Sequence, residues 1–148
     1  MRRRIATRKL APRRSCRASC GVHARLFSQT VFSSGGAHGD DLTVKPLWDA
    51  LYAANADVIV SGHDHDYERF AAQTPEAKPD ASRGIREFVV GTGGKNHRPF
   101  GPPHANSEIR DAEAFGVLKL TLLPGRYAWE FVPEEGKTFQ DSGAGTCH

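Results

Sequence analysis

The amino-acid sequence predicts an α/β fold, and three features of its apolar pattern support this prediction. Apolar residues recur at helical spacing over residues 43–55. Residues 57–60 (Asp-Val-Ile-Val) follow closely and have the composition of a short buried strand. Residues 117–122 and 127–132 alternate around Pro124-Gly125, which is the pattern of a β-hairpin. With 148 residues, 39% of them hydrophobic, the chain is long enough to form one domain with a core.

The segment 43–55 is predicted to be an amphipathic helix that packs on the sheet. Pro46 falls in the first turn, where its missing N–H is tolerated, and Asp41 or Thr43 can cap the start. One face of this helix carries the apolar residues Leu47, Leu51 and Ala54. A helix followed by a strand is typical of an α/β sheet.

The region after residue 70 alternates between loops and strands. Residues 73–84 are polar and contain two prolines, and residues 95–107 contain three, so both are predicted to be surface loops. His97 and His104 in the second loop are expected to be solvated rather than metal ligands. Residues 87–90 are predicted to form a strand that ends in Gly91-Thr92-Gly93-Gly94. Such a turn can bind phosphate or can supply positive φ, and the absence of a P-loop lysine favours the second interpretation.

The motif Gly62-His63-Asp64-His65 directly follows the predicted strand at 57–60. Alternate residues of an extended chain share a face, so both imidazoles can turn toward one point. Imidazole is the commonest metal ligand among side chains, and open α/β sheets bind ligands beyond the carboxyl ends of their strands. The sequence therefore indicates a metal site here, and the alternative is two loop histidines without a ligand.

The surrounding segment, residues 61–70, resembles the last metal-binding motif of the calcineurin-like metallophosphoesterases, in particular the branch related to purple acid phosphatases. Residues 32–39, 88–94 and 115–131 resemble the family's neighbouring segments, and the resemblance extends over residues 31–148. It implies the C-terminal part of a metallophosphoesterase-type β-sandwich flanked by helices. The domain would be incomplete, would contribute roughly one sheet and would expose an apolar edge.

The resemblance also implies a function and a set of site residues. The function is hydrolysis of phosphate esters with two divalent or mixed-valence metal ions, for which Fe, Zn, Mn or Ca are candidates. His63 and His65 would each bind a different metal, and His38 would face the substrate phosphate and act in catalysis. Asp64 is expected to point away from the metals, and Asp66 to hold an imidazole N–H. Tyr67, Glu68 and Arg69 are expected to pack and pair locally.

Several of the family's motifs have no counterpart in this chain. No Asp-x-His, Gly-Asp-x-x-Asp or Gly-Asn-His motif precedes residue 31, and Ser28-Gln29-Thr30 stands where the family has a metal-binding histidine. The chain is therefore predicted to be inactive alone. The alternative is a non-catalytic remnant that acts as a binding module with a basic arm.

Residues 1–30 differ in character from the rest. They carry nine Arg or Lys residues and no acid, which leaves a net charge of −6 for residues 31–148. The segment is predicted to be disordered or not native to this fold, through a shifted reading frame, or else to be an anion-binding arm or a targeting peptide. Because the rest is acidic, nucleic acid is not an expected partner, and the partner that the resemblance implies is a phosphate-ester substrate. The sequence shows neither a secretory signal nor an apolar run that would span a membrane, and although relatives are often secreted, the localisation is left open.

Overall fold

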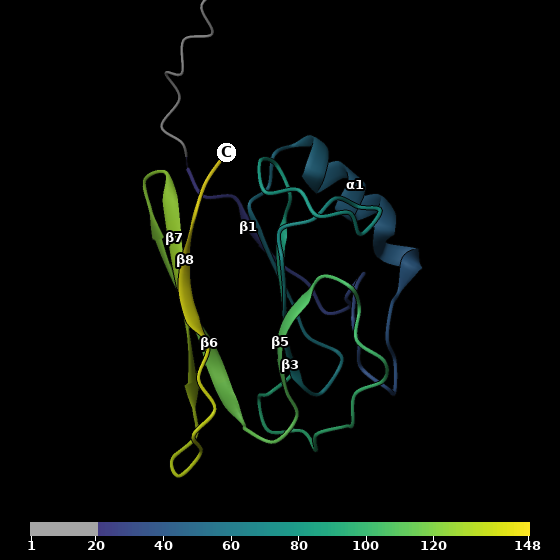
Figure 1. Cartoon of the computed structure of the whole chain (residues 1–148), viewed down its shortest axis with the longest axis vertical. Helices are drawn as coiled ribbons and strands as arrows, with labels where there is room; N and C mark the ends of the chain where they lie inside the picture. Colours follow the sequence, from purple (N-terminus) through teal and green to yellow (C-terminus); the bar gives the residue numbers. More distant parts are fainter. Residues whose placement is uncertain (1–20) are drawn as a thin grey trace, which may run out of the picture.

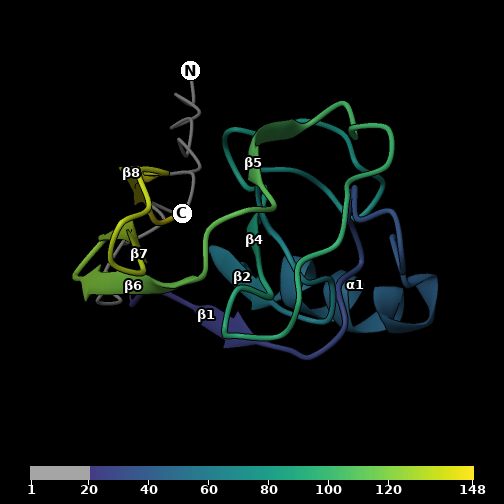
Figure 2. The same cartoon turned by 90° about the horizontal axis from the view of Figure 1, so that it is seen from below.

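The computed structural model describes residues 21–148 and contains two β-sheets and one short α-helix. The two sheets face each other, and the helix lies on the other side of the larger sheet (Figures 1 and 2). This mixed α/β arrangement matches the predicted fold class, with both sheets of the sandwich present rather than roughly one. Within the described residues, no helix is long and apolar enough to cross a membrane.

The larger sheet has five strands in the order β1-β2-β4-β3-β5. The first three strands of this order are parallel, and β3 and β5 continue the sheet in antiparallel pairing. The smaller sheet is an antiparallel meander in the order β6-β7-β8. The strands are β1 (Ala24–Leu26), β2 (Val58–Ser61), β3 (Tyr67–Phe70), β4 (Arg86–Val90), β5 (Ser107–Asp111), β6 (Gly116–Leu123), β7 (Arg126–Pro133) and β8 (Ser142–Thr146).

The helical segment begins with a 3-10 turn, η1 (Leu42–Val44), and continues as α1 (Lys45–Ala53). The Asp41 carboxylate accepts a hydrogen bond from the Thr43 N–H at 3.0 Å and so caps η1, as the sequence suggested. Pro46 lies in the first turn of α1, also as predicted. The helix ends near the predicted position, two residues earlier than expected.

Each interface between layers has its own hydrophobic cluster. The first lies between α1 and the larger sheet and includes Phe32, Trp48 and Ile59. Phe32 and Trp48 meet edge to face, with 5.1 Å between ring centroids. The second cluster lies between the sheets and includes Val58, Tyr67, Phe88, Tyr127, Trp129 and Phe131. The two clusters bury opposite faces of β2, since Ile59 belongs to one and Val58 to the other.

Residues 21–30, the described part of the basic segment, contain β1 and the buried Thr30. The strand pairs in parallel with β2, Ala24 opposite Val58 and Leu26 opposite Val60. These residues therefore have an ordered place in the fold. The basic residues before position 21 lie outside the described residues, and the predicted domain boundary at residue 30 stays a prediction.

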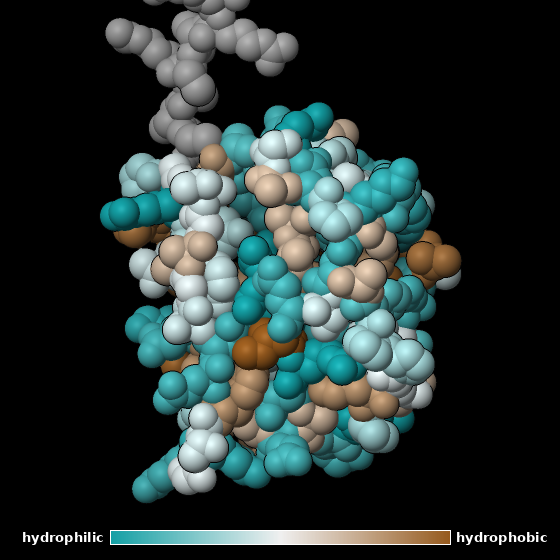
Figure 3. Space-filling view, viewed as in Figure 1, coloured by the Kyte–Doolittle hydropathy of each residue, from teal (hydrophilic) through white to brown (hydrophobic). Residues whose placement is uncertain are grey.

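The face of the molecule shown in Figure 3 is mainly hydrophilic, with apolar side chains scattered between polar ones. Large exposed apolar residues occur on the edge strands β1 and β6, on the central strand β7 and on the helical segment: Leu26, Leu42, Leu47, Val117, Leu122, Leu123 and Val132. The exposed apolar edge expected of an incomplete domain stays a prediction.

Candidate functional site

Three loops meet beyond the carboxyl ends of the parallel strands β2 and β4. They are residues 31–41, which precede η1, residues 62–66, which follow β2, and residues 91–106, which follow β4. The first and third loops are joined by two main-chain hydrogen bonds, from Gly36 to Pro99 at 3.0 Å and from Gly101 to Ser34 at 2.7 Å. The histidine motif therefore lies at a strand end, as the sequence predicted, between two loops that are held together.

His63 lies at the exposed surface of the second loop and contacts His38 of the first. Their ring centroids are 4.3 Å apart and the planes are tilted by 45°. The His63 backbone has φ = 71°, in the left-handed region that few residues other than glycine adopt. Such backbone geometry is common at functional sites because the surrounding structure must hold it. The structure thus brings together two of the three residues selected from the sequence.

His65 is held by the loop that follows β4. Its ring atom Nδ1 lies 3.0 Å from the main-chain oxygen of Asn96, and the Arg98 N–H donates to the main-chain oxygen of His65 at 3.3 Å. A carbonyl oxygen only accepts hydrogen bonds, so Nδ1 is the donor, and in the neutral ring Nε2 keeps its lone pair. That is the form of imidazole that binds a metal ion. Asn96 acts through its backbone, which is why no side-chain pattern pointed to it.

Asp64 is buried and faces away from the loop surface, as expected. Its carboxylate accepts hydrogen bonds from the Ser33 hydroxyl and from the Gly39 N–H, the latter at 3.2 Å. A Cβ on Gly35 would overlap this carboxylate, and one on Gly91 would overlap the Asp64 main-chain oxygen. Asp64 therefore connects the loop that carries His38 to the loop that carries His63. The glycines of Phe-Ser-Ser-Gly and Val-Gly-Thr-Gly were the sequence signal for this close approach.

Glu68 and Arg69 pair over long range, and the expectation that they pair locally was wrong. Glu68 is fully buried and accepts from the Ser34 N–H at 2.7 Å and from its hydroxyl at 2.6 Å. Arg69 bonds to Glu108 and, at 2.7 Å, to Asp141. Glu68, the one acidic residue of β3, points inward to its partner Ser34 in the loop before η1.

Asp66 does not hold an imidazole, and that expectation was also wrong. Both of its carboxylate oxygens are buried and lack a hydrogen-bond partner within residues 21–148. Burial, together with the nearby Asp64 and Glu68 carboxylates, raises the pKa of Asp66 to about 7. The cost of burying an unpaired carboxylate is thus reduced by protonation.

The two histidines that were expected to be solvated are packed instead. His97 stacks on Phe115 with 4.1 Å between ring centroids. His104 lies 2.9 Å from Asp40 through Nε2 and contacts the edge of Phe32. The glycine turn contains Gly94 with φ = 116°, which agrees with the interpretation that the turn needs positive φ. These loop residues shape the site rather than extend its ligand set.

The resemblance implies two metal ions, which would need several side-chain ligands close together. Among the described residues, no group of three or more His, Cys, Asp or Glu side chains is arranged to hold a metal ion. Asp64 accepts from Ser33 and Gly39 through one carboxylate oxygen, and Asp64 and Asp66 are both buried beneath the loop surface. The residues present therefore do not fit a dinuclear metal centre, because two imidazoles cannot fix two ions.

The fold is that of part of a metallophosphoesterase-like domain. A solved purple acid phosphatase from yellow lupin (Lupinus luteus) seeds, PPD1, is similar with a TM-score of 0.64 and 22% sequence identity over 82% of this chain. A second solved structure, GAP50, described as the anchor in the inner membrane complex of Plasmodium, is similar with a TM-score of 0.62 and 18% identity, also over 82% of this chain. No family model and no curated protein matches the sequence.

The chain spans only part of these two proteins, 24% of the phosphatase and 35% of the anchor protein. At this level of identity the likeness shows the fold alone. It agrees with the phosphatase-like fold that the sequence motifs implied, and it leaves the activity, the metal ions and the substrate to be proposed.

Proposed function

We propose that this chain supplies the C-terminal part of the active site of a metal-dependent phosphoester hydrolase and is inactive alone. His63 and His65 are the metal ligands in this proposal, and His38 is the residue that faces the substrate phosphate. The observation that carries the proposal is the contact between His38 and His63 at the carboxyl end of β2. Two loops far apart in the sequence bring imidazoles together at the place where α/β sheets bind ligands.

The orientation of His65 supports the same proposal. The Asn96 carbonyl fixes its tautomer and leaves Nε2 as the free nitrogen. The missing ligands explain why the chain alone should not hydrolyse phosphate esters, since a bridging carboxylate and the other ligands must come from polypeptide that is not part of it.

Metal binding by the full 148-residue chain tests the ligand assignment. Titration calorimetry with Zn²⁺ should show weak binding that His63→Ala and His65→Ala each abolish. His23→Ala is the matched control, because His23 is exposed and lies before β1, away from the three loops. Zn²⁺ binding that survives both substitutions, or that is lost in the control, would show that the ligand assignment is wrong.

Activity tests the rest of the proposal. The chain alone should not hydrolyse p-nitrophenyl phosphate. When the upstream metal motifs of a related phosphatase are joined to it, activity should appear and should be lost on substitution of either His63 or His65. Unchanged activity in those variants would show that neither residue is a metal ligand.

A non-catalytic binding module is the second candidate. It is favoured by the incomplete ligand set among the described residues and by the similarity to a protein described as an anchor. This candidate predicts salt-dependent binding to anionic surfaces through the basic segment. Removal of residues 1–20, rather than 1–30, is the appropriate test, because β1 and Thr30 belong to the fold. Binding to anionic vesicles that is unaffected by this truncation would exclude a basic arm.

A further inference from the structure

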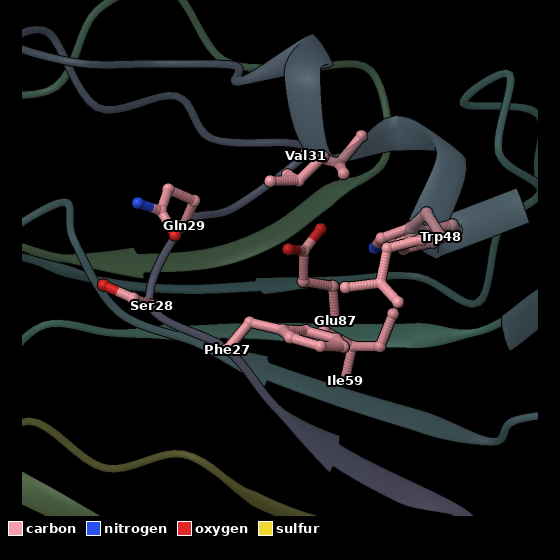
Figure 4. Close-up of a pocket in the computed structure, with 9 residues that line it drawn as sticks. Phe27, Ser28, Gln29, Val31, Trp48, Ile59 and Glu87 are labelled. Atoms are coloured by element: carbon pink, nitrogen blue, oxygen red, sulfur yellow. The ribbon is translucent and has the colours of Figure 1, made fainter. Parts of the chain in front are cut away.

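A cavity of about 100 Å³ lies between the larger sheet and α1, apart from the three histidines. Its inner wall is buried and consists of Trp48, Ile59 and Glu87, while Ser28, Gln29 and Leu47 are exposed at its outer end. The cavity therefore has a route to solvent. The residues that line it are Phe27, Ser28, Gln29, Val31, Val44, Leu47, Trp48, Ile59 and Glu87 (Figure 4).

Two buried polar atoms of this wall lack a hydrogen-bond partner within residues 21–148. They are Oε2 of Glu87 and Nε1 of Trp48. In Figure 4 the Glu87 carboxyl group projects into the space between Phe27 and Val31, and the Trp48 nitrogen lies on the edge of the indole that faces it. Buried polar groups are rarely left without a partner, so these two atoms indicate an occupant.

The hydrogen bonds around Glu87 determine what that occupant must offer. Thr30 Oγ1 lies 2.7 Å from the main-chain oxygen of Phe32 and 2.7 Å from Glu87 Oε1. The Thr30 hydroxyl has one proton, and the Phe32 carbonyl can only accept it. The Thr30 hydroxyl shares its proton between this carbonyl and Glu87 Oε1, so Oε1 has a partner. Oε2 is the Glu87 oxygen that is left as an acceptor without a partner within residues 21–148.

The buried environment of Glu87 favours the neutral form of its carboxyl group. The side chain is fully buried next to apolar residues, and its closest polar contact besides Thr30 is the Ser61 hydroxyl, 3.2 Å from Oε1. Burial raises the pKa of Glu87 to about 8, although the hydrogen bonds of Thr30 and Ser61 act in the opposite direction. The cavity thus presents one acceptor, Glu87 Oε2, and one donor, the Trp48 N–H.

We propose that this cavity is a binding site for a small neutral alcohol with an apolar body. A hydroxyl group can donate to Glu87 Oε2 and accept from the Trp48 N–H at the same time. An ammonium ion cannot accept, and a carbonyl group cannot donate. A cavity of about 150 Å³ holds benzene, so the smaller volume here suits an alcohol of about four carbon atoms.

Binding of 1-butanol to the full chain tests the proposal by NMR. Titration should shift the indole N–H signal of Trp48 until the site is saturated. The Trp129 indole is an internal reference, because it donates to Asp141 at 3.2 Å in the other core cluster. The matched probe 1-chlorobutane lacks the hydroxyl and should bind about thirtyfold more weakly, since both hydrogen bonds are lost.

Two substitutions of Glu87 distinguish a hydrogen bond between the alcohol and Glu87 from non-specific binding of an apolar molecule in the cavity. Glu87→Gln places its amide against Thr30 and its carbonyl toward the cavity, so the preference for butanol should remain. Glu87→Met removes the acceptor and leaves only the Trp48 N–H, so the preference for butanol should fall to about one third or less of its wild-type value. An undiminished preference in Glu87→Met, or no preference in the wild-type chain, would overturn the proposal.

A pair of leucine substitutions keeps the proposal testable if Glu87→Met fails to fold. Leu47→Phe narrows the outer end of the cavity and should weaken butanol binding. Leu42→Phe is the control, because Leu42 is exposed on η1 and does not line the cavity. An indole shift that never saturates, or that responds equally to both variants, would mean that the cavity holds only water and would reject an alcohol site.

Discussion

The imidazole rings of His38 and His63 lie 4.3 Å apart, although the two residues belong to different loops. Asp64, the neighbour of His63, holds these loops together by accepting hydrogen bonds from Ser33 and Gly39, which flank the loop of His38. The site geometry therefore depends on a buried carboxylate that does not itself reach the surface.

Asp64→Ala should separate the two histidines and destabilise the fold. It removes the hydrogen bonds of the Asp64 carboxyl group and leaves the buried Ser33 hydroxyl without an acceptor for its proton, at a cost of about 3 kcal/mol. Urea unfolding measures the loss, and NMR cross-relaxation between the His38 and His63 rings measures their separation. Asp49→Ala is the control, because Asp49 is exposed and forms only a helix-surface ion pair with Lys45, worth less than about 0.5 kcal/mol. If the two rings stay in contact in Asp64→Ala, the loops of His38 and His63 keep their positions without the Asp64 carboxylate.

Glu87 should make the stability of the wild-type chain fall as the pH rises. Its pKa in the folded state is about 8, whereas its ordinary value is 4.5. Between these values the folded chain keeps a proton that the unfolded chain has released, so the free energy of unfolding decreases by up to about 1 kcal/mol per pH unit. The decrease should end above about pH 8, where both states are ionised.

Comparison with Glu87→Gln isolates this effect. The amide does not titrate, so urea unfolding at several pH values should give a flatter profile for the variant. Asp66, whose pKa is also raised, contributes equally to both proteins and cancels in the difference. Two profiles of the same slope would mean that Glu87 is ionised in the folded chain.

The parts of the fold that the sequence predicted well are those in which apolar spacing and tertiary burial agree. The helix, β2, β4 and the β6–β7 hairpin are of this kind. The missed strands have sequences that local preference disfavours. β8 reads Ser-Gly-Ala-Gly-Thr, and a Cβ on Gly143 or Gly145 would overlap the rings of Trp129 or Tyr127. These glycines are needed for packing between neighbouring strands, which spacing along one strand does not reveal.

The candidate site shows the same limit. The motif placed His63 and His65 at a strand end, and the resemblance directed attention to His38. The partners of the buried acids could not be predicted, because Glu68 bonds to Ser34 and Asp64 to Ser33, in a loop distant in the sequence. A buried carboxylate usually has a hydrogen-bond partner, but only the tertiary structure shows which residue it is, or, for Asp66, that none lies within residues 21–148.

Substitution of the β8 glycines tests the packing explanation. Gly143→Val should destabilise the chain by about 2 kcal/mol, because its side chain would occupy the space of the Trp129 ring. Ala144→Val is the control, since Ala144 is exposed on the other face of the same strand and valine favours a strand. Thermal unfolding should show a lower melting temperature only for Gly143→Val. Equal melting temperatures for the two variants would show that Gly143 is not needed for packing against Trp129.

Asp141 should connect the two sheets. It accepts from the Tyr67 hydroxyl at 2.7 Å, from Arg69 Nε at 2.7 Å and from the Trp129 indole at 3.2 Å. Burial acts to raise its pKa, but the hydrogen bonds from Arg69 and Tyr67 together lower it below 3.8. A lowered pKa stabilises the fold above pH 3.8, and this contribution is lost as the pH falls through the folded-state value.

Asp141→Asn should therefore lower the free energy of unfolding at pH 7 by roughly 2 kcal/mol. The free energy of unfolding of this variant should also depend less on pH in the acidic range. Acid titration of both proteins, followed by tryptophan fluorescence, measures the difference. Glu130→Gln on the same sheet is the control, because its ion pair with Lys119 is exposed. If Asp141→Asn unfolds at the same acidic pH as the wild-type chain, other carboxylates control acid unfolding.

Ser28 stands in the segment where the resembled family has a metal-binding histidine. The Gly62 N–H donates to the Ser28 main-chain oxygen at 3.3 Å, so Ser28 lies directly beside the histidine loop. If His63 and His65 are metal ligands, Ser28→His should add a third imidazole and raise the Zn²⁺ affinity by at least about tenfold. The control is Thr43→His, which adds an imidazole on exposed η1. Calorimetry should show tighter binding for Ser28→His only, and this gain should disappear when His63 is also replaced by Ala. A gain that is independent of His63 would place the metal elsewhere and would favour the binding-module candidate.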